Sequence, residues 1–204
     1  MTKRDPSFTA LIPVKERSVR FPGKNFARFK DTTLLTHAVT KLRELPHTKH
    51  ILISTDAPNK VAQCLEAGKV DMEDLTILER PPHLCDDIAT TDAVVQHVLT
   101  RQGKLDADEI VVVTQVNAPL WESGDLAFAL EDFVNERRQT TVTASPIYQP
   151  NGCFYIFRVG TFMTFRRIYA GNLFLWILPF ERSIDIDYPW QLPVAEAVDY
   201  GNFA

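Results

Sequence analysis

The sequence predicts an α/β fold in which helices cover both faces of a mostly parallel, open sheet. Short apolar runs alternate with longer runs of helical spacing through the first two thirds of the chain, and the connections between them are short. Of the 204 residues, 45% are hydrophobic and 24% are charged, as in ordinary globular proteins. Because a domain commonly holds about 100 to 200 residues, residues 1–204 are expected to form a single domain.

The first half of the chain contains three strand signals and two helix signals. Strands are predicted at residues 8–13, 50–54 and 75–78. Between the first two strands, one helix face is formed by Leu34, Leu35, Ala38, Val39, Leu42 and Leu45. The next helix is expected to be capped by Asp56, to carry Pro58 in its first turn and to end before Gly68.

The second half begins with the same alternation and then changes. Residues 109–114 are almost wholly apolar, as expected of a strand covered on both faces, and helices are predicted at 90–101 and 123–134. The last third predicts mainly strands, at 141–145, 153–157 and 173–178, and a final helix from Pro189. Ligands of such folds bind beyond the carboxyl ends of the strands, so chemistry is expected in the segments that follow them.

Charge, cysteine content and apolar run length exclude several classes. The net charge of −4 argues against a broad basic face for duplex nucleic acid. The cysteines, Cys64, Cys85 and Cys153, show neither disulfide nor zinc-site spacing. The longest apolar runs are far too short to cross a membrane, and the first residues lack the apolar core of a signal peptide. We therefore expect a cytoplasmic protein without nucleic-acid or membrane partners.

The strongest local signal is a basic loop after the first strand. Residues 13–25 (PVKERSVRFPGKN) place Lys15, Arg17, Arg20 and Lys24 in one connection. Cations and backbone donors that converge in this way can hold a polyphosphate, and Gly23 allows the chain to approach it closely. The loop is neither a Walker A motif nor a dinucleotide-binding fingerprint. The alternative interpretation is a solvated basic loop.

A late acidic pair is the second signal. In Ser183-Ile-Asp-Ile-Asp187, a strand would direct Asp185 and Asp187 to one face and the isoleucines into the core. Two carboxylates so close repel each other unless a cation lies between them, and hard oxygen ligands suit Mg²⁺. The alternative is an exposed edge strand with solvated acids.

Three weaker signals follow other strands. Arg80 lies where a ligand is expected, although a surface ion pair would explain it equally well. Gln115 directly follows the buried strand 109–114, where a polar amide commonly faces the ligand crevice. Helix capping is the simpler explanation for most members of the polar group Asp86, Asp87, Thr90, Thr91 and Asp92.

Taken together, these segments resemble the acylneuraminate cytidylyltransferases (CMP-N-acetylneuraminate synthetases). The resemblance covers residues 11 to about 198 and rests on Leu11-Ile-Pro-Val-Lys15, Ser18, Arg20-Phe-Pro-Gly-Lys-Asn25, Ser54-Thr-Asp56, Arg80-Pro81, Leu84, Asp87, Thr90-Thr91, Gln115, Pro119-Leu120, Asn151-Gly-Cys-Phe-Tyr155 and Ser183-Ile-Asp-Ile-Asp187. It implies a three-layer, Rossmann-like sheet of the nucleotide-sugar transferase type. It also implies a homodimer that joins CMP from CTP to a sialic-acid-like sugar acid, with Mg²⁺ as cofactor and pyrophosphate as the second product.

The resemblance also implies roles for individual residues. Lys15 and Lys24 would hold the triphosphate, with Ser18 and Arg20 nearby. The cytidine part would contact Asn25, Arg80 and Thr91, and the sugar would contact Gln115. Asp185 and Asp187 would bind Mg²⁺, and with Lys15 and Lys24 they form the expected catalytic set.

Two departures from the family pattern keep other functions open. The family loop usually reads Arg-Gly-Gly-Ser-Lys-Arg, whereas this chain has Glu16 in place of a glycine and Val19 in place of the lysine. The dimerisation segment near 145–148 is shortened, unless residues are missing there. The alternatives are a cytidylyltransferase for the eight-carbon acid Kdo or another sugar acid, and a non-catalytic nucleotide-binding module.

Overall fold

A computed structural model describes residues 6–86, 88–103 and 105–199. Its main feature is a seven-stranded sheet in the order β5-β4-β1-β6-β8-β7-β9. The strands are β1 (Phe8–Val14), β4 (Thr48–Thr55), β5 (Leu75–Glu79), β6 (Ile110–Thr114), β7 (Thr140–Ala144), β8 (Pro150–Arg158) and β9 (Leu173–Ile177). Only β8 runs against its neighbours within this sheet. The predicted mostly parallel sheet is thereby confirmed.

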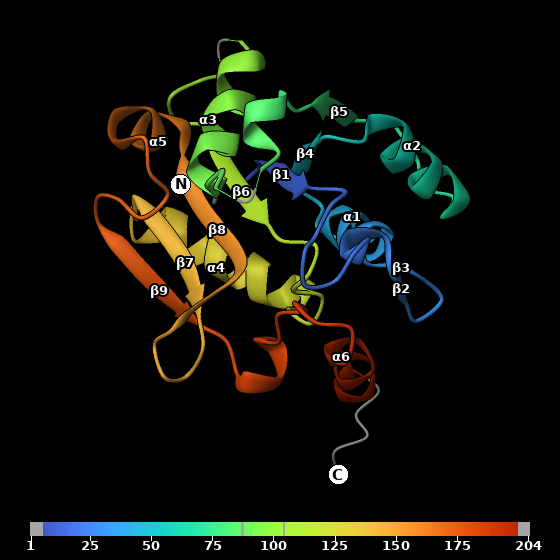
Figure 1. Cartoon of the computed structure of the whole chain (residues 1–204). Coiled ribbons are helices and arrows are strands. Elements are labelled where there is room, and N and C mark those ends of the chain that lie inside the picture. The colour runs from blue at the N-terminus through green and yellow to red at the C-terminus, as the bar shows by residue number, and fades with distance from the viewer. Residues whose placement is uncertain (1–5, 87, 104, 200–204) are drawn as a thin grey trace.

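Helices cover both faces of the sheet and make three layers (Figure 1). One face packs on α1 (Leu34–Arg43), α2 (Pro58–Ala67), α4 (Ser123–Asn135) and α6 (Gln191–Asp199). The other face packs on α3 (Thr91–Arg101) and α5 (Val159–Phe165). Strand β1 shows why both faces are apolar: Ala10 and Ile12 join the first core, Leu11 joins the second, and all three are fully buried.

The element boundaries agree with the sequence prediction to within a few residues, with some exceptions. Asp56 does not cap α2; the cap position is Ala57, and the Asp56 carboxylate instead accepts a hydrogen bond from the backbone N–H of Glu16 at 2.8 Å. Helix α6 begins at Gln191 rather than at Pro189. Helix α5 and the two-residue strands β2 (Arg28–Phe29) and β3 (Thr32–Thr33) were not predicted.

Residues 183–187 are not a strand, contrary to the prediction. They form an irregular segment, and its apolar alternation is kept because Ile186 is fully buried and Ile184 packs against the same core. The backbone N–H of Ile186 donates to the carbonyl of Asn117 at 2.7 Å, so a loop rather than a neighbouring strand holds it.

A tight turn joins β7 to β8. The backbone N–H of Ser145 donates to the carbonyl of Gln149 at 2.9 Å, and that of Tyr148 donates to the carbonyl of Ser145 at 2.8 Å. This turn brings the start of the reversed strand β8 to the edge where β1, β4 and β6 end. Across the described ranges, no helix is both long and apolar enough to span a bilayer.

Candidate active site

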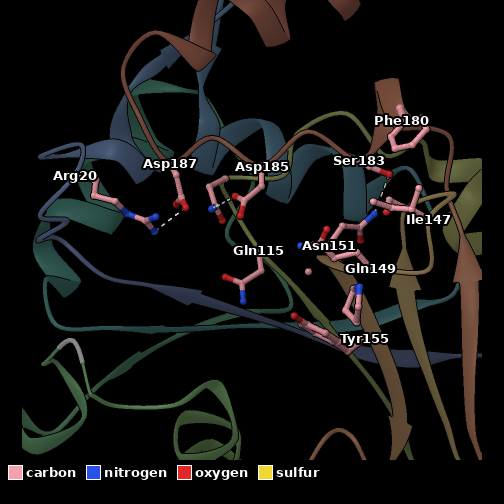
Figure 2. Close-up of a pocket in the computed structure, with 14 residues that line it drawn as sticks. Arg20, Gln115, Ile147, Gln149, Asn151, Tyr155, Phe180, Ser183, Asp185 and Asp187 are labelled. Carbon is pink, nitrogen blue, oxygen red and sulfur yellow. Dashed lines mark hydrogen bonds and ion pairs between the residues drawn. The ribbon is translucent and has the colours of Figure 1, made fainter.

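Two adjoining cavities lie at the carboxyl edge of the parallel strands. The basic cavity, of about 420 Å³, is lined by the cationic residues Lys15, Arg17, Arg20, Lys24 and Arg80, by one acidic residue, Asp86, and by neutral neighbours. The amide cavity, of about 570 Å³, is lined by Gln115, Asn117, Gln149 and Asn151 among others (Figure 2). Arg20, Gln115 and Asn117 line both, so the two spaces form one continuous cleft.

The loop after β1 folds so that its cations face the basic cavity. Gly23 has a φ of 72°, in the left-handed region that glycine adopts without strain, and the short 3₁₀ helix Lys24–Phe26 begins directly after it. The side-chain amide of Asn25 donates to the carbonyl of Lys15 at 2.8 Å and so closes the loop on itself. Ser18 and Val19 line the same cavity.

Glu16 does not oppose this positive charge at the cavity wall. Its carboxylate pairs with Lys60 on α2 at 3.1 Å, and it is not among the residues that line the basic cavity. Glu16, which stands where the family pattern has a glycine, therefore adds no carboxylate to the described lining of the basic cavity.

Arg80 is buried, which excludes the surface ion pair considered for it. Its guanidinium donates to the carbonyl of Ser54 at 2.7 Å and to the Ser54 hydroxyl at 3.3 Å, and burial lowers its pKa. Carbonyl and hydroxyl acceptors at the end of β4 thus hold a cation in the wall of the basic cavity.

The start of α3 completes the basic cavity. Thr90 caps this helix by accepting from the backbone N–H of Ala93 at 3.2 Å, and Thr91 lines the cavity. Asp92 instead faces away and accepts from the backbone N–H of Ile168 at 2.9 Å. Asp86 accepts from the N–H groups of Ile88 and Ala89, whereas Asp87 lies outside the described residues.

The acidic pair meets the basic loop across the cleft. Asp187 binds Arg20 at 2.6 Å and Lys24 at 2.9 Å, and the Lys24 side chain is only 12% exposed. In Figure 2, Asp185 and Asp187 point to the same side of their segment, toward Gln115. The two regions that the sequence identified separately therefore form one site.

Asp185 is held differently from Asp187. Its carboxylate accepts a hydrogen bond from the side-chain amide of Asn117. Desolvation in the cleft, and then the negative charge of Asp187, raise the pKa of Asp185 to about 6. A bound cation beside this pair would favour the ionised form.

The residues at this point have the donor chemistry of a hard divalent cation. The carboxylates of Asp185 and Asp187 line the amide cavity together with the side-chain amides of Gln115 and Asn117, which also line the basic cavity. Within the described ranges, no group of three or more His, Cys, Asp or Glu side chains forms a closed metal cage. Such an open set fits Mg²⁺, which binds through few carboxylates and keeps water and phosphate ligands.

Several lining residues were not assigned roles from their own sequence context. Asn117 lies two residues beyond Gln115 in the same connection, a spacing that could have identified it. Gln149, Asn151 and Tyr155 come from the β7–β8 hairpin, whose turn and register are set by tertiary pairing. The hydroxyl of Ser145 is buried without a hydrogen-bond partner in the described part of the chain.

Comparisons with known proteins point to one family. The family model described as Cytidylyltransferase matches residues 9–154. The chain is 21% identical to post-translational flagellin modification protein B of Campylobacter coli, over 85% of this chain and 87% of that protein. It is 27% identical to 3-deoxy-manno-octulosonate cytidylyltransferase of Geobacter metallireducens, over 55% of this chain and 44% of that protein.

Solved structures share the fold at low identity. A CMP:2-keto-3-deoxy-manno-octonic acid synthetase solved in complex with CTP superposes with a TM-score of 0.71 at 14% identity, covering 97% of this chain and 100% of that one. A 4-diphosphocytidyl-2C-methyl-D-erythritol synthase gives a TM-score of 0.65, also at 14% identity, covering 95% and 98%. The sheet of the nucleotide-sugar transferase type that the resemblance implied is thus confirmed.

Proposed function

The chain belongs to the cytidylyltransferase family, and on that premise we propose that it transfers CMP from CTP to a sialic-acid-like sugar acid and releases pyrophosphate. The observation that supports this most strongly is that a cation-lined cavity adjoins an amide-lined cavity that contains an acidic pair. The first suits a nucleoside triphosphate, and the second suits a polyhydroxylated acceptor.

The lining of the basic cavity supports the proposed nucleotide site. Lys15 and Lys24 would bind the phosphates, with Ser18 and Arg20 beside them, and Asn25, Arg80 and Thr91 would surround the nucleoside. In an in-line displacement the sugar hydroxyl attacks the α-phosphorus while negative charge grows on the leaving pyrophosphate. Fixed lysines stabilise that charge without reorganising, and both reactants are held at reacting distance.

Asp185 and Asp187 would hold Mg²⁺ at the junction of the cavities. When bound there, the cation would neutralise phosphate charge beside the reacting phosphorus. Asp187 already binds Lys24, so the acidic pair and the phosphate-binding loop are kept in register before substrate arrives.

The amide cavity favours an N-acylated acceptor over a plain eight-carbon acid. Gln115, Gln149 and Asn151 offer hydrogen bonds to sugar hydroxyls. Ile147 and Phe180, which are 67% and 56% exposed, line the same cavity and offer an apolar contact for an acyl methyl group. The Geobacter relative and the CTP-bound synthetase are both named for an eight-carbon acid, so Kdo-like acids remain the second candidate.

Pyrophosphate release from CTP tests the proposal directly. We expect release with an N-acylated nine-carbon sugar acid, less release with Kdo, and none with Asp185→Ala plus Asp187→Ala. Turnover that survives the double substitution would refute the metal assignment. CTP binding without turnover of any sugar acid would instead support a non-catalytic nucleotide-binding module. Light scattering of the purified chain tests the homodimer that the family resemblance implies.

A further inference from the structure

The amide cavity contains few groups that could recognise a negatively charged acceptor. A sugar acid carries a carboxylate at neutral pH, and a carboxylate removed from water requires a cation or several strong donors. Among the described residues that line the amide cavity, the single cationic side chain is Arg20; the other charged residues there are Asp185 and Asp187.

Arg20 already forms an ion pair with a carboxylate. Its guanidinium lies 2.6 Å from an oxygen of Asp187, and its Cζ lies 5.5 Å from the centre of the Tyr188 ring. Figure 2 shows the side chain reaching from its loop toward Asp187 at the end of the cavity. Arginine presents five N–H donors in a planar fork, so one contact with Asp187 leaves others for a second carboxylate.

The basic cavity does not depend on Arg20 for its charge. Lys15, Arg17, Lys24 and Arg80 line that cavity and are not part of the amide-cavity lining. The Arg20 side chain is 54% exposed, whereas that of Lys24 is 12% exposed. Of the two cations on Asp187, Lys24 is therefore the more enclosed, and Arg20 is the more accessible to a molecule in either cavity.

We infer that Arg20 recognises the carboxylate of the sugar-acid acceptor, rather than serving chiefly to bind the triphosphate. This assignment rests on the proposed function, because it concerns the second substrate of that reaction. Before the acceptor binds, Asp187 is paired with the Arg20 guanidinium. When Arg20 turns toward the substrate, Asp187 keeps its ion pair with Lys24. The result is selection for acids over neutral sugars of the same shape.

Steady-state kinetics of Arg20→Ala and Arg20→Lys separate the two roles of this residue. We expect Arg20→Ala to raise the KM for the sugar acid by about tenfold or more, as for a lost charge-assisted hydrogen bond, and to change the KM for CTP less than threefold. Arg20→Lys keeps the charge without the fork and should recover part of the loss. Arg101→Ala, an exposed arginine in the last turn of α3, the end away from the cavity-lining Thr91, is the matched control.

The acceptor itself supplies a second comparison. The wild type should favour the acid over its carboxamide by about tenfold or more, and Arg20→Ala should lose this preference. An unchanged preference, or a rise in the KM for CTP as large as that for the acid, would overturn the assignment.

Calorimetric binding of the acid, in the presence of CTP and EDTA, distinguishes this inference from the proposed function. Binding that Arg20→Ala abolishes, with no turnover by the wild type, refutes the transfer reaction and keeps the carboxylate contact. Turnover with equal binding by both proteins refutes the contact alone. No binding to the wild type refutes both.

Discussion

Replacing Ile186 by alanine should destabilise the protein and loosen the acidic pair together. Ile186 is fully buried between Asp185 and Asp187, and alanine lacks three of its carbon atoms. At about 0.8 kcal/mol per buried carbon, the transfer loss is about 2.4 kcal/mol, and an incompletely filled cavity brings the total to about 3–4 kcal/mol. For a chain of 204 residues, this corresponds to a fall in Tm of roughly 6–16 °C.

Differential scanning calorimetry measures the fall in Tm, and calorimetric titration with Mg²⁺ in the presence of CTP measures the affinity of the site for the cation. The Ile186 side chain anchors the segment that carries both aspartates, and its backbone N–H donates to the Asn117 carbonyl, so cation affinity should fall as well. Ile88→Ala is the control, because Ile88 is 86% exposed and its truncation should leave the Tm within about 1 °C. A Tm loss no larger than that of the control would refute the buried placement of this segment.

Three further predictions concern the loop and the carboxylates. Lys24→Ala should lower kcat/KM for CTP by tenfold or more, because it removes a nearly buried cation that the proposed function places on the phosphates. The control is Lys49→Ala, at the start of β4 and away from the cavities, whose kcat/KM in the same assay should stay within about twofold of the wild-type value. The pKa of Asp185 is raised to about 6, so between about pH 4 and pH 6 the folded state keeps a proton that the unfolded chain has released, and stability is lost as the pH rises through this range. Asp185→Asn removes this titration and should therefore raise the Tm more at pH 7 than at pH 4. An equal gain in Tm at both pH values would contradict the raised pKa. At Gly23 an added Cβ would meet open space, but the φ of 72° is unfavourable for alanine. Gly23→Ala should therefore lower the free energy of unfolding by about 1 kcal/mol and the Tm by roughly 2–4 °C. An unchanged Tm would argue against the left-handed turn.

Much of the fold could be predicted because periodicity reflects burial. The apolar run 109–114 and the helix face from Leu34 to Leu42 report which side chains leave water, and the structure buries both. The same logic explains the error at 183–187. Alternation predicts an extended backbone with Ile186 inward, but it does not predict a neighbouring strand, and here the partner is the carbonyl of Asn117. Helix α5 has only seven residues, too few for a clear period.

The candidate site was predictable where it follows from strand ends. Lys15, Lys24 and Gln115 follow β1 and β6, which are adjacent and parallel, so their convergence required only the sheet order. The contact of Asn117 with Asp185 joins residues far apart in the chain and depends on how the last segment crosses the sheet. The burial of Arg80 could not be predicted either, because its acceptors are mainly carbonyl groups that every residue possesses.

The reversed direction of β8 gives the two cavities walls of different kinds. The segments that line the basic cavity are embedded in strand–helix crossovers, where a change in length would shift a core element. One wall of the amide cavity is instead a surface hairpin, with Gln149 and Asn151 beside its turn. Lengthening or trimming that turn would therefore reshape the amide cavity while β1, β4 and β6 stay in register.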